Sequence, residues 1–303
     1  MSNTSPEVVI HIEGLTKRYG KVVALDHLNL DVYRGEIFGY LGPNGAGKTT
    51  TIRTLLDLIR PTAGYATIFG LDTQKDSVMV HAQLGNLPGE LSMWGHMTGW
   101  EVVRYLGGLR GGVDEKYVEE LAERLDFDLT NKVKRLSSGN KRKLGIIQSM
   151  MHKPPLLILD EPTNGLDPLV QQTFHKLMRE VRDEGRTVFL SSHNLPEVEA
   201  ICDRVGILRE GRLQAVESIA NLKQVRFRWM GLRLANGERA DPEAFKVLPG
   251  VSDVTTENGS IRFRVTGEVD PVIKMAAQYH VVDLAYEEPS LEEIFLTYYG
   301  ESK

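Results

Sequence analysis

One glycine-rich turn constrains the fold of this chain more than any other feature, and it reads Gly42-Pro43-Asn44-Gly45-Ala46-Gly47-Lys48-Thr49. The turn fits the pattern G-x-x-x-x-G-K-[ST] at every position. A buried strand is expected before it, at 36–42, and the apolar residues after it, at 52–59, follow helical spacing. Backbone N–H groups at glycines can curl around phosphate oxygens, and the following helix points its positive end at the same anion. The turn therefore predicts a nucleotide-binding loop between a strand and a helix.

Two side chains of this loop are expected to take part in phosphate binding. Lys48 is placed to reach the β- and γ-phosphates, and Thr49 to offer its hydroxyl to Mg²⁺, with Thr50 next in the same cradle. The alternative is a glycine-rich turn with an incidental lysine. The strand before the loop and the helix after it favour phosphate binding.

The order of elements predicts an α/β fold. Turns at 19–20 and 34–35 divide residues 8–42 into strands, and further buried strands are expected at 154–161 and 187–193. Asp167 is expected to cap, and Pro168 to open, the helix between the last two strands. Residues from about 75 to 150 are expected to be mostly helical, with loops at 85–90 and 107–113. Strands that alternate with helices predict a mainly parallel sheet covered on both faces.

Two acidic residues, Asp160 and Glu161, stand at the end of the strand expected at 154–161. Ligands of open parallel sheets lie at the carboxyl ends of the strands. We therefore expect Asp160 to bind Mg²⁺, directly or through water, and Glu161 to orient or deprotonate an attacking water. The alternative is a pair of solvated loop acids.

The sequence pattern changes near residue 218. Residues 225–229 and 261–265 alternate polar and apolar side chains, as half-exposed strands do. A closing helix is expected after them, with Ser290 and Glu293 at capping-box spacing. These observations predict a domain at 1–218 and a separate small α+β domain at 219–303.

Residues 135–151 contain a small polar loop before a helical pattern, and they read RLSSGNKRKLGIIQSMM. Alone, this segment would be an ordinary helix N-cap. Beside the other motifs it resembles the signature of ATP-binding-cassette (ABC) ATPases, and the order of motifs is similar to that family over about 1–218. The resemblance implies a P-loop NTPase cassette with a mainly parallel sheet, an antiparallel β subdomain and a helical subdomain at about 75–150. It also implies ATP and Mg²⁺ as ligands.

The resemblance implies that two cassettes pack head-to-tail, with each ATP between one phosphate loop and the other subunit's signature. Ser137 and Gly139 would then contact the γ-phosphate across the dimer. Tyr19 matches the aromatic residue that stacks on adenine, although a tyrosine at a strand end is also common. Asp167 matches the loop that crosses between subunits, and His193 matches the histidine that hydrogen-bonds the γ-phosphate.

The chain departs from the family pattern in two places. The signature reads LSSGN instead of LSGGQ, with Ser138 in place of glycine and Asn140 in place of glutamine. Gly89, in the segment LGNLPGE (84–90), stands where the family has a glutamine that links Mg²⁺ to the membrane partner. Glu90 is the candidate replacement.

The C-terminal segment SLEEIFLTYYG, with the strands expected before it, resembles the extension found in the multidrug and antibiotic exporter branch of the family. The alternative is a stabilising appendage with no role toward the substrate. From the resemblance, the chain is expected to be the ATPase subunit of an exporter. It would dimerise with itself or with a paralogous cassette and drive separate multi-span membrane permease subunits. Met93, Trp94, Met97 and Trp100 are expected to form the docking surface, with core packing as the alternative.

Charge and composition narrow the function classes. A net charge of −5 argues against a nucleic-acid partner. The single cysteine, Cys202, allows no intrachain disulfide and is expected to be buried. No signal peptide or membrane span is visible, which predicts a cytoplasmic protein held at the inner face of the cell membrane by its permease. The alternatives are a cassette ATPase acting on the ribosome or nucleic acid, and an ATP-binding regulatory module. Glu161 argues against the second, because a module that only binds ATP needs no base.

Overall fold

The computed structural model describes residues 6–223, 227–235, 240–257, 260–287 and 289. The chain divides into two compact units, Met1–Ile219 and Ala220–Lys303. Each unit is described by itself.

The first unit is built on a six-stranded sheet with the order β10-β9-β3-β8-β7-β6. All neighbouring strands run parallel except β10, which pairs antiparallel with β9. The strands are β3 (Ile37–Leu41), β6 (Leu84–Leu87), β7 (Leu156–Asp160), β8 (Thr187–Ser192), β9 (Arg204–Arg209) and β10 (Arg212–Ser218). Every residue of β3, β7 and β8 is buried, as expected where both faces of a parallel sheet are covered. The α/β prediction is confirmed.

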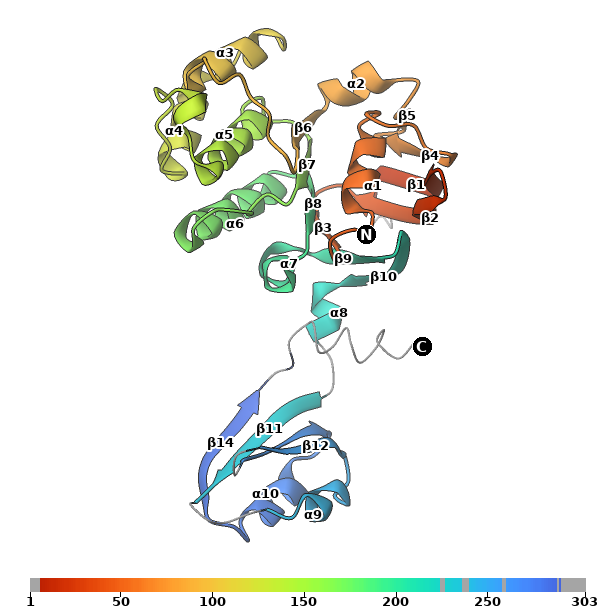
Figure 1. Cartoon of the computed structure of the whole chain (residues 1–303), viewed down its shortest axis with the longest axis vertical. Coiled ribbons are helices and arrows are strands. Elements are labelled where there is room, and N and C mark those ends of the chain that lie inside the picture. Colours follow the sequence, from red (N-terminus) through yellow and green to blue (C-terminus); the bar gives the residue numbers. More distant parts are fainter. Residues whose placement is uncertain (1–5, 224–226, 236–239, 258–259, 288, 290–303) are drawn as a thin grey trace, which may run out of the picture. The chain divides into compact units, whose positions relative to one another are not determined.

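A second, antiparallel sheet in the same unit has the order β2-β1-β4-β5. Its strands are β1 (Val8–Tyr19), β2 (Val22–Tyr33), β4 (Ala63–Ile68) and β5 (Leu71–Asp72). Helix α1 (Lys48–Leu55) packs with both sheets, since Ile10, Phe38 and Ile52 belong to one hydrophobic cluster. Figure 1 shows β1, β2 and β4 on one side of β3, with the helices α3, α4 and α5 on the other.

The region expected to be mostly helical contains five helical segments: α2 (Ser77–Ala82), α3 (Gly99–Gly108), α4 (Glu115–Arg124), the 3-10 helix η1 (Val133–Arg135) and α5 (Ser138–Met150). Side chains of Thr98, Asp114 and Ser137 cap α3, α4 and α5. The prediction of a loop at 85–90 is wrong for its first half, because residues 84–87 form the edge strand β6, which is hydrogen-bonded to β7. A four-residue strand is too short for its alternation to be recognised in the sequence.

The helix expected to follow Asp167 is confirmed. Helix α6 (Pro168–Asp183) begins where the Asp167 carboxylate accepts hydrogen bonds from two backbone N–H groups, and its buried face includes Phe174 and Val181. Helices α7 (Leu195–Ile201) and α8 (Ile219–Lys223) follow later in the chain. Cys202, just after α7, is buried as predicted. No helix within the described residues is long and apolar enough to span a membrane.

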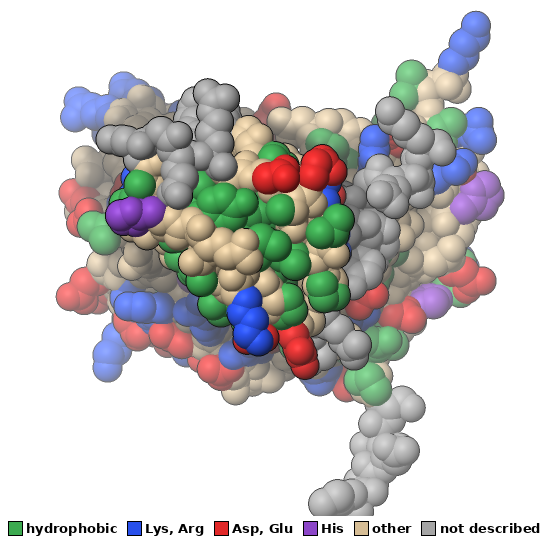
Figure 2. Space-filling view, turned by 90° about the horizontal axis from the view of Figure 1, so that it is seen from below, with side chains coloured by type: hydrophobic (Ala, Val, Ile, Leu, Met, Phe, Trp, Pro, Cys, Tyr) green, Lys and Arg blue, Asp and Glu red, His purple; other side chains and the backbone are tan. Residues whose placement is uncertain are grey.

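The second unit is an antiparallel sheet with the order β12-β13-β11-β14 and two short helices. Its elements are β11 (Phe227–Leu234), α9 (Pro242–Lys246), β12 (Val251–Glu257), β13 (Ser260–Thr266), α10 (Asp270–Ala276) and β14 (Val281–Glu287). Met230, Phe245, Phe263 and Val272 are central to its core. Figure 2 shows hydrophobic side chains gathered on the face toward the reader, and the exposed apolar residues of this unit include Val282, Leu284 and Tyr286 of β14. The closing helix predicted around Ser290 and Glu293 lies outside the described residues.

Candidate active site

The phosphate loop joins β3 to α1, as predicted, and glycine is required in it on steric grounds. Gly45 and Gly47 have φ angles of 83° and 112°, in the region that favours glycine. A Cβ atom at Gly42 would lie 2.4 Å from the carbonyl oxygen of Leu208, and one at Gly47 would lie 2.7 Å from that of Ala24. The loop is therefore held tightly against the neighbouring backbone.

The N-terminus of α1 is suited to an anion. Its N-cap, Gly47, offers no side-chain hydrogen bond, and the first turn carries no acidic residue. The first N–H groups of a helix have no partner within the helix, so they and the helix dipole attract negative charge. This end of α1 can therefore bind a phosphate group.

Lys48 folds back over its own loop. Its side chain is 6% exposed, and Nζ donates to the carbonyl oxygens of Gly42 at 2.6 Å and Pro43 at 3.3 Å. The same Nζ lies 3.3 Å from Oε1 of Glu161. An ammonium group held only by carbonyl oxygens and one carboxylate can exchange these partners for phosphate oxygens.

Thr49 and Asp160 contact each other at the carboxyl end of β7. The Thr49 hydroxyl donates to Oδ2 of Asp160 at 2.9 Å, and the Ser191 hydroxyl donates to Oδ1. Asp160 is 2% exposed. Hydroxyl and carboxylate oxygens suit Mg²⁺, which usually takes few protein ligands and completes its shell with water and substrate phosphates. The described part of the chain has no cluster of three or more His, Cys, Asp or Glu side chains arranged for a metal.

Glu161 is held in a strained backbone conformation beside His193. Its φ angle is 51°, and its N–H donates to the backbone and side-chain oxygens of Ser191. Nδ1 of His193 donates to Oε2 of Glu161 at 2.7 Å. A non-glycine residue with positive φ at the end of a buried strand is typical of functional sites. The Glu161 and His193 pair is able to accept a proton from a water molecule placed at the carboxyl ends of β7 and β8.

The remaining predicted residues lie elsewhere. Tyr19, at the end of β1, is 49% exposed, with Nζ of Lys17 5.0 Å from the centre of its ring. Gly139 packs against Gly165 in the loop before Asp167, where an added Cβ would lie 2.7 Å from the Gly165 oxygen. Within the described residues, no hydrogen bond or ion pair joins Tyr19 or Gly139 to the phosphate loop. The structure thus gathers Lys48, Thr49, Asp160, Glu161 and His193, but neither Tyr19 nor the signature.

The sequence did not reveal a buried network behind these residues. The carboxylate of Glu197, on α7, accepts hydrogen bonds from the hydroxyls of Thr163 at 2.7 Å and Ser192 at 2.6 Å. It thereby joins the segments that follow β7 and β8. Burial raises the pKa of Glu197, although both hydrogen bonds lower it. No sequence signal identifies this glutamate, since a glutamate on a short helix is usually exposed.

Comparisons with known proteins agree with this arrangement. The family model for ABC transporters matches residues 25–164. A relative from Enterococcus faecalis, the bacitracin transport ATP-binding protein BcrA, is 36% identical over 84% of each chain. Another, the linearmycin resistance ATP-binding protein LnrL of Bacillus subtilis, is 30% identical over 96% of this chain and 98% of its own.

A solved structure described as the ATP-binding subunit of an ABC transporter has a similar fold. It is 28% identical, covers 71% of this chain and 92% of its own, and superposes with a TM-score of 0.65. The fold, the phosphate loop and the relatives that match most of the chain all indicate the same family. The chain belongs to the ABC transporter family, and it is the ATP-binding, ATP-hydrolysing subunit of such a transporter.

Proposed function

We propose that Glu161 is the base for ATP hydrolysis and that His193 positions it. The observation that carries this proposal is the 2.7 Å contact between the two side chains, beside the Lys48 ammonium. Lys48 and the backbone and side chains of 42–50 would hold the phosphates, and Tyr19 would stack on adenine. Thr49 and Asp160 would hold Mg²⁺, which would supply positive charge to stabilise the phosphoryl group during hydrolysis.

We further propose that the active unit is a head-to-tail dimer. Ser137 caps α5 with a hydrogen bond to the Asn140 N–H, which leaves other N–H groups of the first turn for an anion. Within its own chain this helix start faces Gly165 and not the phosphate loop. A two-fold partner would bring Ser137, Gly139 and Asp167 to the ATP held by the first chain. The partner is a second copy or a paralogous cassette.

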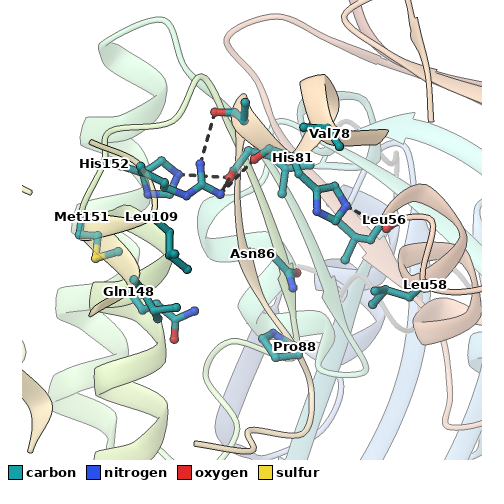
Figure 3. Close-up of a pocket in the computed structure, with 14 residues that line it drawn as sticks. Leu56, Leu58, Val78, His81, Asn86, Pro88, Leu109, Gln148, Met151 and His152 are labelled. Atoms are coloured by element: carbon teal, nitrogen blue, oxygen red, sulfur yellow. Dashed lines mark hydrogen bonds between the residues drawn. The ribbon is translucent and has the colours of Figure 1, made fainter. Parts of the chain in front are cut away.

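A groove on the same unit is the proposed contact with the membrane partner (Figure 3). It is a cavity of about 680 Å³, lined by residues of α2, β6, α3 and α5 and of the segments that follow α1, β6, α3 and α5. Apolar side chains such as Val78, Leu109 and Met151 line it together with Asn86 and Pro88. Pro88 directly precedes Gly89, whose Cβ position is 3.0 Å from Asp160. A short helix of a permease seated here would thus touch the segment that reaches the metal-binding carboxylate.

The four residues expected to form the docking surface lie beside α3. None of them is fully buried, and Trp94 is 44% exposed, with its ring 5.2 Å from that of Tyr105. Met93, Met97 and Trp100 are partly buried, so core packing remains the alternative explanation for these three side chains. We keep the cluster as part of the proposed surface for the permease, which would hold the protein at the inner face of the membrane.

Export of an antibiotic or a similar amphipathic compound is the proposed biological role. The names of the relatives, bacitracin transport and linearmycin resistance, support it. We propose 1–218 as the ATP-hydrolysing domain and 219–303 as an accessory domain of such an exporter. The test is to replace the chain in its host with the Lys48→Ala variant and to measure uptake of labelled bacitracin and linearmycin. Export predicts higher cellular accumulation of at least one compound, and unchanged accumulation of all of them argues against it.

A further inference from the structure

The guanidinium group of Arg142 is buried beside the active site, although no motif marks it. Arg142 lies on α5, two residues after the signature segment, and is 7% exposed. Nη1 donates to the carbonyl oxygen of Pro88 at 2.9 Å, and Nη2 to that of Gly89 at 2.7 Å. A buried cation with two main-chain acceptors fixes the backbone that it holds.

The segment that Arg142 holds touches Asp160. A Cβ atom at Gly89 would lie 3.0 Å from Oδ2 of Asp160, the same oxygen that accepts the hydrogen bond from Thr49. The charges of Asp160 and Glu161 also reach the guanidinium: burial lowers the pKa of Arg142, and these two carboxylates raise it. Glu90, the candidate replacement for the missing glutamine, is exposed. Arg142 therefore lies within electrostatic range of the acidic pair, and its hydrogen bond to Gly89 holds the segment beside Asp160.

We propose that Arg142 is a positioning residue for ATP hydrolysis, which holds the Gly89 backbone against Asp160 and so fixes the carboxylate that binds Mg²⁺. In this chain a side chain from the signature helix reaches the segment where the family pattern has a glutamine. Movement of α5 is transmitted through the hydrogen bonds from Arg142 to the carbonyl oxygens of Pro88 and Gly89, and from Gly89 to Asp160. The inference rests on the proposed metal-binding role of Asp160.

Because α5 also begins with the signature, the same contact links the two sites of a dimer. The start of α5 would face the ATP of the partner, and Arg142, one turn further on, faces the acidic pair of its own chain. A rigid helix moves as one body, so binding at one end changes the position of the other. Arg142 thus connects engagement of the partner's nucleotide with the geometry of the chain's own metal site.

The experiment compares Arg142→Met with Arg142→Lys in the full chain. The first readout needs no turnover: it is the Mg²⁺ concentration that gives half of the ATP-induced rise in melting temperature, in a Glu161→Gln background. We expect Arg142→Met to raise that concentration about 10-fold, since removing a group that orients a metal ligand typically costs this much or more. The affinity for ATP in the presence of EDTA should stay within about twofold. Arg142→Lys, which can bond one carbonyl at a time, should recover part of the effect.

The second readout is the turnover number with Glu161 intact. We expect Arg142→Met to lower it about 10-fold without a matching change in the Michaelis constant for ATP. Arg204→Met is the control for loss of a partly buried guanidinium. Arg204 bonds Glu36 and the carbonyl oxygen of Asp31, between β9, β2 and β3. This control should lower the melting temperature but leave the Mg²⁺ requirement unchanged.

Asp160→Asn separates failure of the inference from failure of the proposed site. If Asp160→Asn leaves the Mg²⁺ requirement unchanged, the proposed metal site itself is wrong, and the inference falls with it. If Asp160→Asn raises that requirement but Arg142→Met behaves like Arg204→Met, the site stands and the role of Arg142 is refuted. If Arg142→Met does not fold, Arg142→Lys alone decides: a requirement equal to that of the unmutated chain refutes the inference.

Discussion

Nδ1 of His193 donates a hydrogen bond to Oε2 of Glu161 across 2.7 Å, although the two residues are 32 positions apart in the chain. The contact exists because β7 and β8 are parallel neighbours, so their carboxyl ends meet at one edge of the sheet. The Ser191 backbone and hydroxyl hold the Glu161 N–H at the same place. The carboxylate is thus fixed from two sides beside Lys48.

Glu161→Gln should slow ATP turnover while ATP still binds. The amide keeps the shape of the side chain but cannot accept a proton, and loss of a positioned base costs about 10²–10⁴-fold. The measurement is phosphate release, together with ATP affinity from fluorescence titration. Lys48→Ala is the contrasting variant, because it should weaken binding itself. Turnover near that of the unmutated chain in Glu161→Gln would refute the assignment.

Each nucleotide site should be shared between two chains. A mixed dimer of one Lys48→Ala chain and one Gly139→Asp chain tests this, because the carboxylate introduced at the signature would repel the γ-phosphate. Shared sites place both lesions in one site and leave the other intact, so the mixed dimer should trap one ATP. Each mutant homodimer should trap none.

The quantity to measure is the number of ATP molecules trapped per purified mixed dimer. The unmutated dimer, which should trap two, is the reference. Sites built within single chains would both be damaged in the mixed dimer. Trapping of no ATP there would contradict the shared-site model.

Val78→Glu should release the chain from its membrane partner without loss of ATP hydrolysis. Val78 is 83% exposed and lines the groove, so a carboxylate there costs little stability but opposes an apolar contact. Co-purification with the permease is the measurement. Val247→Glu is the matched control, since Val247 is 79% exposed and lies in the other unit.

Trp94→Glu locates the contact more finely. If it alone abolishes co-purification and Val78→Glu does not, the contact lies at the cluster beside α3 and not in the groove. If neither substitution reduces co-purification, both proposed surfaces are wrong.

The stability of the Glu197→Gln variant, relative to that of the unmutated chain, should increase as pH rises. Burial raises the folded-state pKa of Glu197 above 4.5, so the folded protein binds this proton more tightly than the unfolded chain does. Stability is therefore lost as pH rises from 4.5 through the raised pKa, and glutamine removes that loss. The difference in urea midpoint between the variant and the unmutated chain should grow as the pH rises from 4.5 through the raised pKa of Glu197. A difference in urea midpoint that stays flat over this pH range would contradict the prediction.

Local sequence determined the elements whose signals are strong and short in range. The apolar runs at 36–42, 154–161 and 187–193 became the buried strands β3, β7 and β8, because a strand covered on both faces needs no polar side chain. Asp167 and Pro168 fixed the start of α6 through the backbone bonds that a helix leaves open. The glycines fixed the phosphate loop, since no other residue fits where the Leu208 and Ala24 carbonyls approach.

Only the tertiary structure decided which of these elements share a site. The strand β6 escaped prediction because four residues at a sheet edge carry too little periodicity, and its pairing with β7 is what places Gly89 beside Asp160. No local sequence pattern marks Arg142 or Glu197 as buried, because the partners that make burial of a charged side chain possible lie up to 54 positions away in the chain. Motifs arise from local backbone geometry and are therefore visible in sequence. Contacts between them depend on the order and register of strands, which the folded sheet alone sets.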